Sequence, residues 1–286
     1  MWWVAWWAAV AAIGAIGTIA SLNSVRFGHR VAHEAQEMAA SADGPARPVA
    51  PSQLSTLPAP VQRYLTKAVG ERSRPIGRVR LRHAGRFRPS LAGSWLPIRG
   101  EQYFATSPPG FVWWGRVRIA PGVWIDARDR SVGGIGNMLV TIESTITIAN
   151  SRGAELDEGA LLRLLGEMVW FPTAFLDDRY VHWSAIDDRH ARAALTVNGR
   201  TVEGEFEFGP DDLPAAFSAR RYRDAGGGKS VLTPFVGRLI DFRRTDGVLV
   251  PYRVVGAWVV DGKTIEYADF EVQRLELDGH GPWPRR

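Results

Sequence analysis

From Arg78 onward, side chains repeatedly alternate between polar and apolar, and this period of two favours β-strands. In residues 78–88 the arginines share one parity, while Val79, Leu81 and Phe87 share the other. Similar alternation, or a comparable strand-like run, is found in residues 111–119, 137–149, 180–186, 191–197, 201–208, 237–242, 248–260 and 264–277. These patterns predict half-buried strands whose arginine-rich faces point to solvent.

The connections between these segments indicate how the strands pair. Asn198-Gly199, Asp246-Gly247 and Asp261-Gly262 are dipeptides typical of two-residue hairpin turns. Successive strands lack crossover helices, so the sheet is expected to be antiparallel. About a dozen strands exceed what a flat open sheet accommodates. The predicted fold is therefore mainly β with some helix (α+β), a curved antiparallel sheet or incomplete barrel.

One helix interrupts the strands at residues 157–176, DEGALLRLLGEMVWFPTAFL. Its leucines recur at helical spacing, Asp157 is a candidate N-cap, and Pro172 is expected to end the helix. Apolar residues cover most of its surface, which predicts burial on several sides. We expect this mid-chain helix to cover or plug the curved sheet.

The N-terminus carries a second long apolar segment. Residues 2–22 contain no charged side chain and are long enough to span a hydrocarbon core of ~30 Å. No basic residue precedes them, which favours an uncleaved membrane anchor over a signal peptide. Arg26 and Arg30 favour a cytoplasmic domain by the positive-inside rule. We therefore predict a single-pass membrane protein. The side of the membrane on which its soluble domain lies is left undecided by the sequence.

These segments suggest four regions. We expect a transmembrane anchor over 1–25, a juxtamembrane segment and Pro-rich linker over 26–56, the β domain over 57–278 and a tail over 279–286. The β domain is expected to begin with a short helix, in which Pro58 and Pro60 suit the first turn and Gly70 the C-cap.

Composition excludes several kinds of site. The 286 residues carry a formal net charge of +5, with nearly all positive charge on arginine, and contain no cysteine. The six histidines show no metal-binding spacing, so neither a metal nor another cofactor is predicted. Arginine excess would suit nucleic acid, but RNA-binding motifs are missing and no nucleic-acid partner is expected. Gly133-Gly134-Ile135-Gly136 and Gly227-Gly228-Lys229-Ser230 lack complete nucleotide-loop motifs and are interpreted as turns.

Several short motifs resemble an uncharacterised bacterial family, a domain of unknown function. They are residues 57–65 (LPAPVQRYL), 108–113 (PPGFVW), 133–138 (GGIGNM), 167–174 (EMVWFPTA) and 246–251 (DGVLVP). The similarity spans roughly residues 57–277 and implies no activity. More remotely, the order of elements resembles the periplasmic lipoprotein-carrier fold, a half-barrel with an apolar cavity. That resemblance implies acyl-chain binding and an extracytoplasmic location, opposite to the side favoured by Arg26 and Arg30.

Candidate site residues lie on the central helix and on strands near it. An apolar helix would raise the pKa of Glu167 and suit it to acid–base chemistry, but an i,i+4 ion pair with Arg163 is the favoured interpretation. Arg220 and Arg221 are consecutive in a strand, so one should point inward and need an anionic partner. The predicted ligand-binding residues are Trp113, Trp124, Glu167, Met168, Trp170, Phe171, Trp183, Arg220 and Arg221.

Two functional hypotheses follow. The first is a membrane-anchored binding module for an apolar or amphiphilic, lipid-like ligand; the membrane and that ligand are the expected partners. The second is an enzyme that uses Glu167 on an apolar substrate. No catalytic set is predicted, and protein partners are not indicated.

Overall fold

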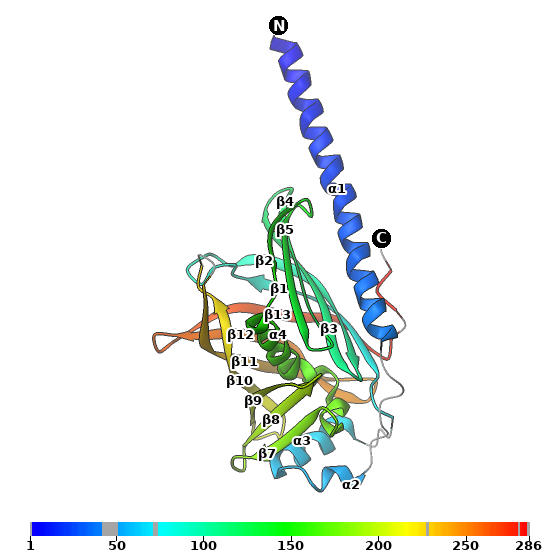
Figure 1. Ribbon diagram of the computed structural model, residues 1–286, viewed down its shortest axis with the longest axis vertical. Coiled ribbons are helices and arrows are strands. Elements are labelled where there is room, and N and C mark those ends of the chain that lie inside the picture. The colour runs from blue at the N-terminus through cyan, green and yellow to red at the C-terminus, as the bar shows by residue number, and fades with distance from the viewer. Residues whose placement is uncertain (1, 42–50, 71–73, 227–228, 280, 285–286) are drawn as a thin grey trace.

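In the part of the chain that the structure describes, one antiparallel sheet of 13 strands forms the body and curls into a half-barrel (Figure 1). The computed structural model describes residues 2–41, 51–70, 74–226, 229–279 and 281–284. The strands are β1 Arg78–Phe87, β2 Leu96–Thr106, β3 Pro109–Ala120, β4 Val123–Val132, β5 Ile135–Ile142, β6 Ile146–Ser151, β7 Val181–Ala185, β8 His190–Val197, β9 Arg200–Phe208, β10 Pro214–Asp224, β11 Ser230–Thr245, β12 Val248–Val260 and β13 Lys263–Leu277. The predicted curved antiparallel sheet is confirmed.

Within the described ranges, six helical segments accompany the sheet. They are α1 Trp2–Ala40, α2 Pro51–Leu54, α3 Ala59–Val69, α4 Ala154–Glu167 and the 3-10 helices η1 Met168–Trp170 and η2 Pro172–Leu176. The start of α3 at the two prolines and its C-cap at Gly70 agree with the sequence.

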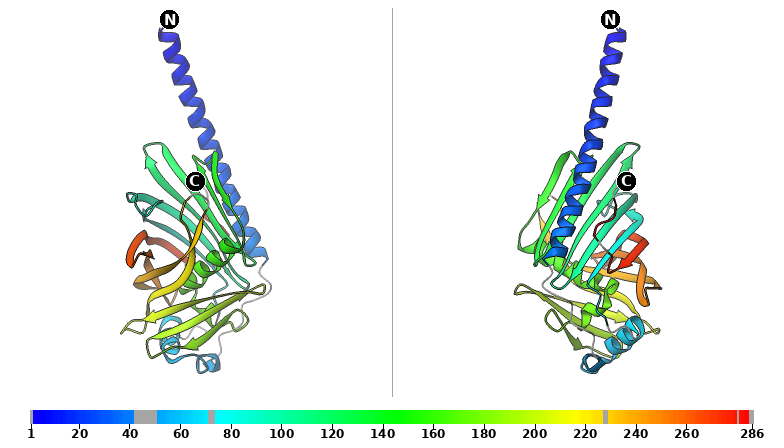
Figure 2. Two further views of the ribbon diagram at one scale, coloured as in Figure 1. Left: turned by 60° about the vertical axis from the view of Figure 1, so that its left-hand side comes forward. Right: turned by 90° about the vertical axis from the view of Figure 1, so that its right-hand side faces the viewer.

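The strand order explains why α4 lies inside the curve. The order is β6-β5-β4-β3-β2-β1-β13-β12-β11-β10-β9-β8-β7, so the chain starts at the centre with β1 and reaches one edge at β6. From there α4 crosses to the opposite edge at β7, and the later strands return to the centre beside β1. Figures 1 and 2 show α4 against the concave face, where it contacts strands of both halves.

The predicted hairpin dipeptides are confirmed as tight turns. Asn198 and Gly199 have φ of 48° and 76°, and the pairs Asp246-Gly247 and Asp261-Gly262 are similar. Two consecutive positive φ angles twist a turn in the same sense as the strands that it joins. Gly133 and Gly134, with φ of 59° and 74°, form another such turn rather than a nucleotide loop. The Gly227-Gly228 pair lies outside the described residues.

The boundaries predicted for the central helix are wrong at both ends. The helix begins earlier, with Gly153 as N-cap, and Asp157 does not cap it. Instead, the Asp157 carboxylate accepts hydrogen bonds from the Gly136 amide and Arg200. The α-helix ends at Glu167 and two 3-10 turns follow, separated by Phe171 at φ −142° and ψ 63°. This break stands where Pro172 disfavours a helical conformation of the preceding residue.

Apolar packing occurs on both faces of the sheet. The larger core lies between the concave face, α3, α4 and the 3-10 helices. On the convex face, Phe27, Val31 and Met38 of α1 pack against Val112 and Leu139. Strands β2 to β5 are thus covered on both sides along part of their length.

The helix α1 extends well beyond the contacts that hold it. Its C-terminal half lies along the convex face, and its N-terminal half projects from the body (Figures 1 and 2). In that half the side chains of Trp2, Trp3, Trp6 and Trp7 are 60–93% exposed. Among the described residues no helix is both long and apolar enough to cross a membrane, so the expected membrane anchor is not supported. Of the predicted linker, residues 42–50 lie outside the described residues, and α2 occupies part of the remainder.

Candidate functional site

The concave face is filled at one end and partly open at the other. At the end near α3, the inward side chains are buried in the larger core. The inward side chains are less buried toward the end from which α1 projects. There Met138, Val140 and Ile142 of β5 face inward but are only half-buried. On the convex side of the same strand, Leu139 and Thr141 are buried. The sheet therefore presents apolar side chains to solvent on its inner surface.

Neighbouring strands extend this surface. Ile125 and Ala127 of β4 pair with Ile142 and Val140 and are also half-buried. We call these five residues (Ile125, Ala127, Met138, Val140 and Ile142) the concave apolar surface.

Aromatic side chains line the opposite wall of the half-barrel. The ring of Tyr267 stacks on Trp258 at a centroid distance of 5.8 Å, and Phe87 lies 6.4 Å from Phe270. Phe235 contacts Trp258 at 5.4 Å. These five residues form the aromatic cluster, in which Phe87, Tyr267 and Phe270 are only half-buried.

A buried ionic cluster on α4 lies between the two walls. The Nε of Arg163 donates to Glu167 Oε1 at 2.8 Å, and its Nη1 donates to Asp129 Oδ2 at 2.9 Å. The guanidinium also lies over the rings of Phe111 and Trp113, at 5.0 and 4.9 Å. The i,i+4 pair that the sequence favoured is confirmed, and Asp129 joins it as a second carboxylate.

Burial governs the electrostatics of this cluster. Burial raises the pKa values of Glu167 and Asp129, and the positive charge of Arg163 opposes both shifts. Burial also acts to lower the pKa of Arg163, but the two carboxylates outweigh it and raise that pKa. Gln102 completes the group because its amide donates to Glu167 Oε2 at 2.6 Å. Both oxygens of Glu167 are therefore occupied by protein donors.

His83 borders the cluster as a neutral side chain. Burial, followed by the charge of Arg163, lowers its pKa to about 3. Its Nε2 accepts a hydrogen bond from Trp113 Nε1 at 2.8 Å, so its proton lies on Nδ1. That Nδ1 is buried and has no hydrogen-bond partner among the described residues. Space for the ring exists because residue 100 is glycine: a Cβ there would lie 2.4 Å from His83 Nε2.

Arg221 is the inward-pointing member of the predicted arginine pair. Its guanidinium lies over Phe235 at 4.7 Å and Trp258 at 5.7 Å, and Nη2 donates to the Gly159 carbonyl at 3.0 Å. Its Nε is buried without a hydrogen-bond partner in the described part of the chain. Arg220 is exposed and donates to the Leu232 carbonyl instead. The prediction that one of the two points inward is confirmed.

The other predicted ligand-binding residues lie in four different places. Trp113 belongs to the ionic cluster, whereas Met168, Trp170 and Phe171 are buried in the larger core. Trp170 Nε1 donates to the Pro251 carbonyl there. Trp183 packs against Phe175 and Phe206 near the sheet edge at β7, and Trp124 lies on the convex face. Of the aromatic residues in this prediction, only Trp113 lies beside the ionic cluster.

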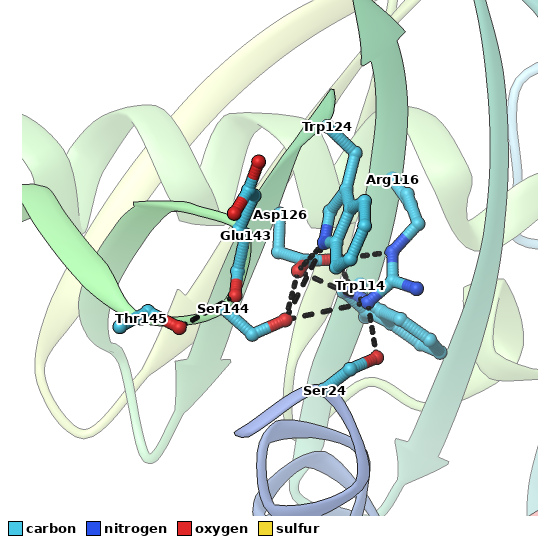
Figure 3. A network of polar contacts seen from close by, with 8 residues as sticks. All are labelled: Ser24, Trp114, Arg116, Trp124, Asp126, Glu143, Ser144 and Thr145. Carbon is cyan, nitrogen blue, oxygen red and sulfur yellow. Dashed lines mark hydrogen bonds and ion pairs between the residues drawn. The ribbon is translucent and has the colours of Figure 1, made fainter. Parts of the chain in front are cut away.

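Figure 3 shows a second polar network, on the convex face. The fully buried carboxylate of Asp126 accepts hydrogen bonds from Trp114, Arg116, Trp124 and Ser144. Arg116 continues the network to Ser24 of α1 at 2.8 Å. Both oxygens of Asp126 are satisfied by protein donors, so this network fastens α1 to the sheet rather than offering a binding site.

Other places in the fold are less suited to a site. Among the described residues no group of three or more His, Asp or Glu is placed to hold a metal ion. A hollow of about 500 Å³ lies between the turns at Gly133-Gly134 and Asn198-Gly199. Asn198 donates to the Gly133 carbonyl and Arg200 pairs with Asp157 there, so its principal polar side chains already have partners.

Comparison with known proteins gives a family and two distant structures. The model of a family of unknown function, DUF6544, matches residues 47–270, and no curated protein matches. A LolA superfamily protein from Nitrosomonas europaea is 13% identical, with a TM-score of 0.38, 78% of this chain and 95% of that chain being covered. A beta-barrel-like protein of the DUF1849 domain of unknown function from Brucella abortus is 8% identical, with a TM-score of 0.23 and coverage of 72% and 99%. Both scores lie below 0.5, and neither bears on function.

Proposed function

The chain belongs to the DUF6544 family, as its sequence motifs predicted, and we propose that its half-barrel is a binding module for an apolar or amphiphilic small molecule. The single observation that carries this proposal is the concave apolar surface. Val140 and Ile142 face the inside of the sheet yet stay half-buried, while their convex-side neighbours Leu139 and Thr141 are buried. A contiguous apolar surface that is left accessible is typical of a ligand or partner site.

The chemistry of the surrounding residues supports an amphiphile. Apolar side chains of β4 and β5 face an aromatic wall on the other half of the sheet, which suits a hydrocarbon chain. Charged side chains of α4 and β10 stand between these walls, and Arg221 of β10 would be the partner of a polar end of the ligand. A few placed polar groups within an apolar site are what orient a small ligand.

The enzyme alternative has one observation in its favour, namely that burial raises the pKa of Glu167. However, Arg163 and Gln102 occupy both carboxylate oxygens at 2.8 and 2.6 Å. A general acid or base must reach a substrate proton, and this carboxylate is held by the protein instead. Binding is therefore the better supported function.

Narrowing the concave apolar surface tests the proposal. Isothermal titration with dodecanol and dodecanoate is expected to show binding to the wild-type protein and at least about tenfold weaker binding to Val140→Trp. Thr201→Trp, an exposed convex-side position in β9, is the matched control and should bind like the wild type. Met168→Trp changes a core position instead of the concave apolar surface. It should lower the stability by about 1–3 kcal/mol through overpacking and leave ligand binding in place.

We also propose that residues 2–22 attach the protein to a membrane. They carry no charge, and four exposed tryptophans mark the end of a helix that leaves the body at Ser24. The open end of the concave face lies on the side from which this helix projects. Recovery of the full chain in the membrane fraction, with its N-terminus intact, would support attachment. A mature N-terminus near Ser21 would contradict it.

A further inference from the structure

We infer that the ligand carries an anionic headgroup, a carboxylate or a phosphate, and that Arg221 holds it beside the aromatic cluster. This inference rests on the proposed binding function and specifies the chemistry of the same site. It depends on how differently Arg163 and Arg221 are satisfied by the protein.

Arg163 is fully engaged by the protein. It pairs with Asp129 and Glu167, at 2.9 and 2.8 Å, and its guanidinium lies over two aromatic rings. Its charge is thereby balanced, and an added anion would compete with two carboxylates that are already in place. This arginine is a poor candidate for a headgroup.

Arg221 has no such balance. Among the described residues it makes no ion pair, and its single hydrogen bond is from Nη2 to the Gly159 carbonyl. Its Nε is buried and lacks a hydrogen-bond acceptor within the same ranges. A guanidinium presents five donors in a planar fork, so most of its capacity is unused. A cation so placed in an apolar setting is stabilised by an anion.

The neighbours of Arg221 favour an anion at the end of a hydrocarbon chain. Its planar group lies over Phe235 and Trp258, which fix its orientation from one side. Tyr267 and Phe270 continue the aromatic wall away from it and are half-buried. Burial raises the pKa of Asp129 and the charge of Arg221 is among the influences that oppose this shift, but among the described residues Asp129 makes its ion pair with Arg163 and none with Arg221. A carboxylate or phosphate could therefore accept from the fork of Arg221 while its chain contacts the rings.

The experiment compares three probes that share one chain: dodecanoate, dodecyl phosphate and dodecanol. In isothermal titration of the wild-type protein, at least one anionic probe should have a dissociation constant at least about tenfold lower than that of dodecanol. Arg221→Gln should abolish that preference while keeping dodecanol binding. Arg220→Gln, one residue away on the convex face, is the matched control and should keep it. Which anion binds more tightly distinguishes a carboxylate from a phosphate ligand.

Arg221→Lys guards against a variant that fails to fold. It keeps the charge without the planar fork and should retain part of the preference. Equal wild-type affinity for all three probes, or a preference that survives in folded Arg221→Gln, would overturn the role of Arg221 and leave the binding function intact. Absence of binding by every probe would instead contradict the binding function itself.

Discussion

Arg220 and Arg221 are consecutive residues of β10, yet Arg220 lies exposed on the convex face while Arg221 lies over two aromatic rings inside the half-barrel. Their pairing partners across the strand, Pro234 and Thr233, keep the regular register, so no bulge disturbs the alternation. Two arginines at consecutive positions thus lie in two different environments, one in solvent and one inside the half-barrel. This geometry provides a control for any experiment on the inward arginine.

Gly100→Ala is expected to destabilise the protein by about 2–3 kcal/mol, because overpacking strains a close-packed site. The added carbon would lie 2.4 Å from His83 Nε2 and 2.5 Å from the Trp114 carbonyl oxygen. Gly159→Ala is the control: apart from its chain neighbours and the backbone of its own helix, no atom lies within 4 Å of a Cβ there. In the middle of α4 it should stabilise by about 0.5–1 kcal/mol. Urea denaturation of both variants measures the difference.

Asp126→Asn is expected to loosen α1 from the sheet (Figure 3). The carboxylate is fully buried and pairs with Arg116 at 2.8 Å, so an amide would leave the arginine unbalanced. Breaking a buried ion pair costs on the order of 3 kcal/mol. Limited proteolysis should then cut between α1 and the body sooner. Asp212→Asn, which removes the exposed pair with Arg63, should change stability by no more than about 1 kcal/mol.

Acidification is expected to stabilise the wild-type protein relative to Glu167→Gln. Burial raises the pKa of Glu167 in the folded state, so the folded protein binds this proton more tightly than the unfolded chain does. Its relative stability therefore rises as the pH falls from above the raised pKa toward the unfolded value of about 4.3. Denaturant titrations at several pH values compare the two proteins.

Asp269→Asn should show the opposite dependence. Hydrogen bonding from Arg253 leads the causes that lower the pKa of Asp269, with burial opposing. The wild-type advantage is then present above the unfolded pKa of about 3.9 and is lost as the pH falls through the lowered folded value. The stability difference between wild type and Glu167→Gln should therefore vary with pH in the opposite sense to that between wild type and Asp269→Asn. The same pH dependence of both would contradict the electrostatic description of the ionic cluster.

Arg80→Gln is expected to cost about 1–3 kcal/mol, as hydrogen bonds to charged groups do. The sequence predicted a freely solvated arginine face, but the side chain of Arg80 is only 15% exposed. It pairs with Glu276 and lies over the Trp283 ring at 4.2 Å, because the C-terminal segment covers it. Arg238→Gln, at an exposed pair with Glu266, should cost less than about 1 kcal/mol. Thermal unfolding of the two variants distinguishes buried from solvated arginines.

The fold was accessible from sequence where local rules decide it. Period-two alternation identified most strands, and residues that tolerate positive φ identified the turns at Asn198, Asp246 and Asp261. The covering of Arg80 by Trp283 was not accessible, because it joins residues about 200 positions apart. The start of α4 was also missed, since Asp157 binds the Gly136 amide across the fold instead of capping its own helix.

The site was only partly accessible for the same reason. The Arg163–Glu167 pair follows from helical spacing, and the inward position of one arginine follows from strand parity. Asp129 was overlooked, although a carboxylate at an inward-facing strand position was a signal for it. Apolarity alone could not separate Met168 and Phe171, which fill the core, from Val140, which stays half-buried. That difference depends on how far α4 extends across the sheet.

Native mass spectrometry of the protein purified under mild conditions is the sharpest test of ligand binding by the concave face. We expect a complex of the wild-type protein with one amphiphilic molecule, reduced in Val140→Trp and kept in Thr201→Trp. After delipidation, added dodecanoate should restore the complex in the wild type. A bare wild-type protein that also takes up no dodecanoate after delipidation would contradict the claim that the concave face binds a ligand.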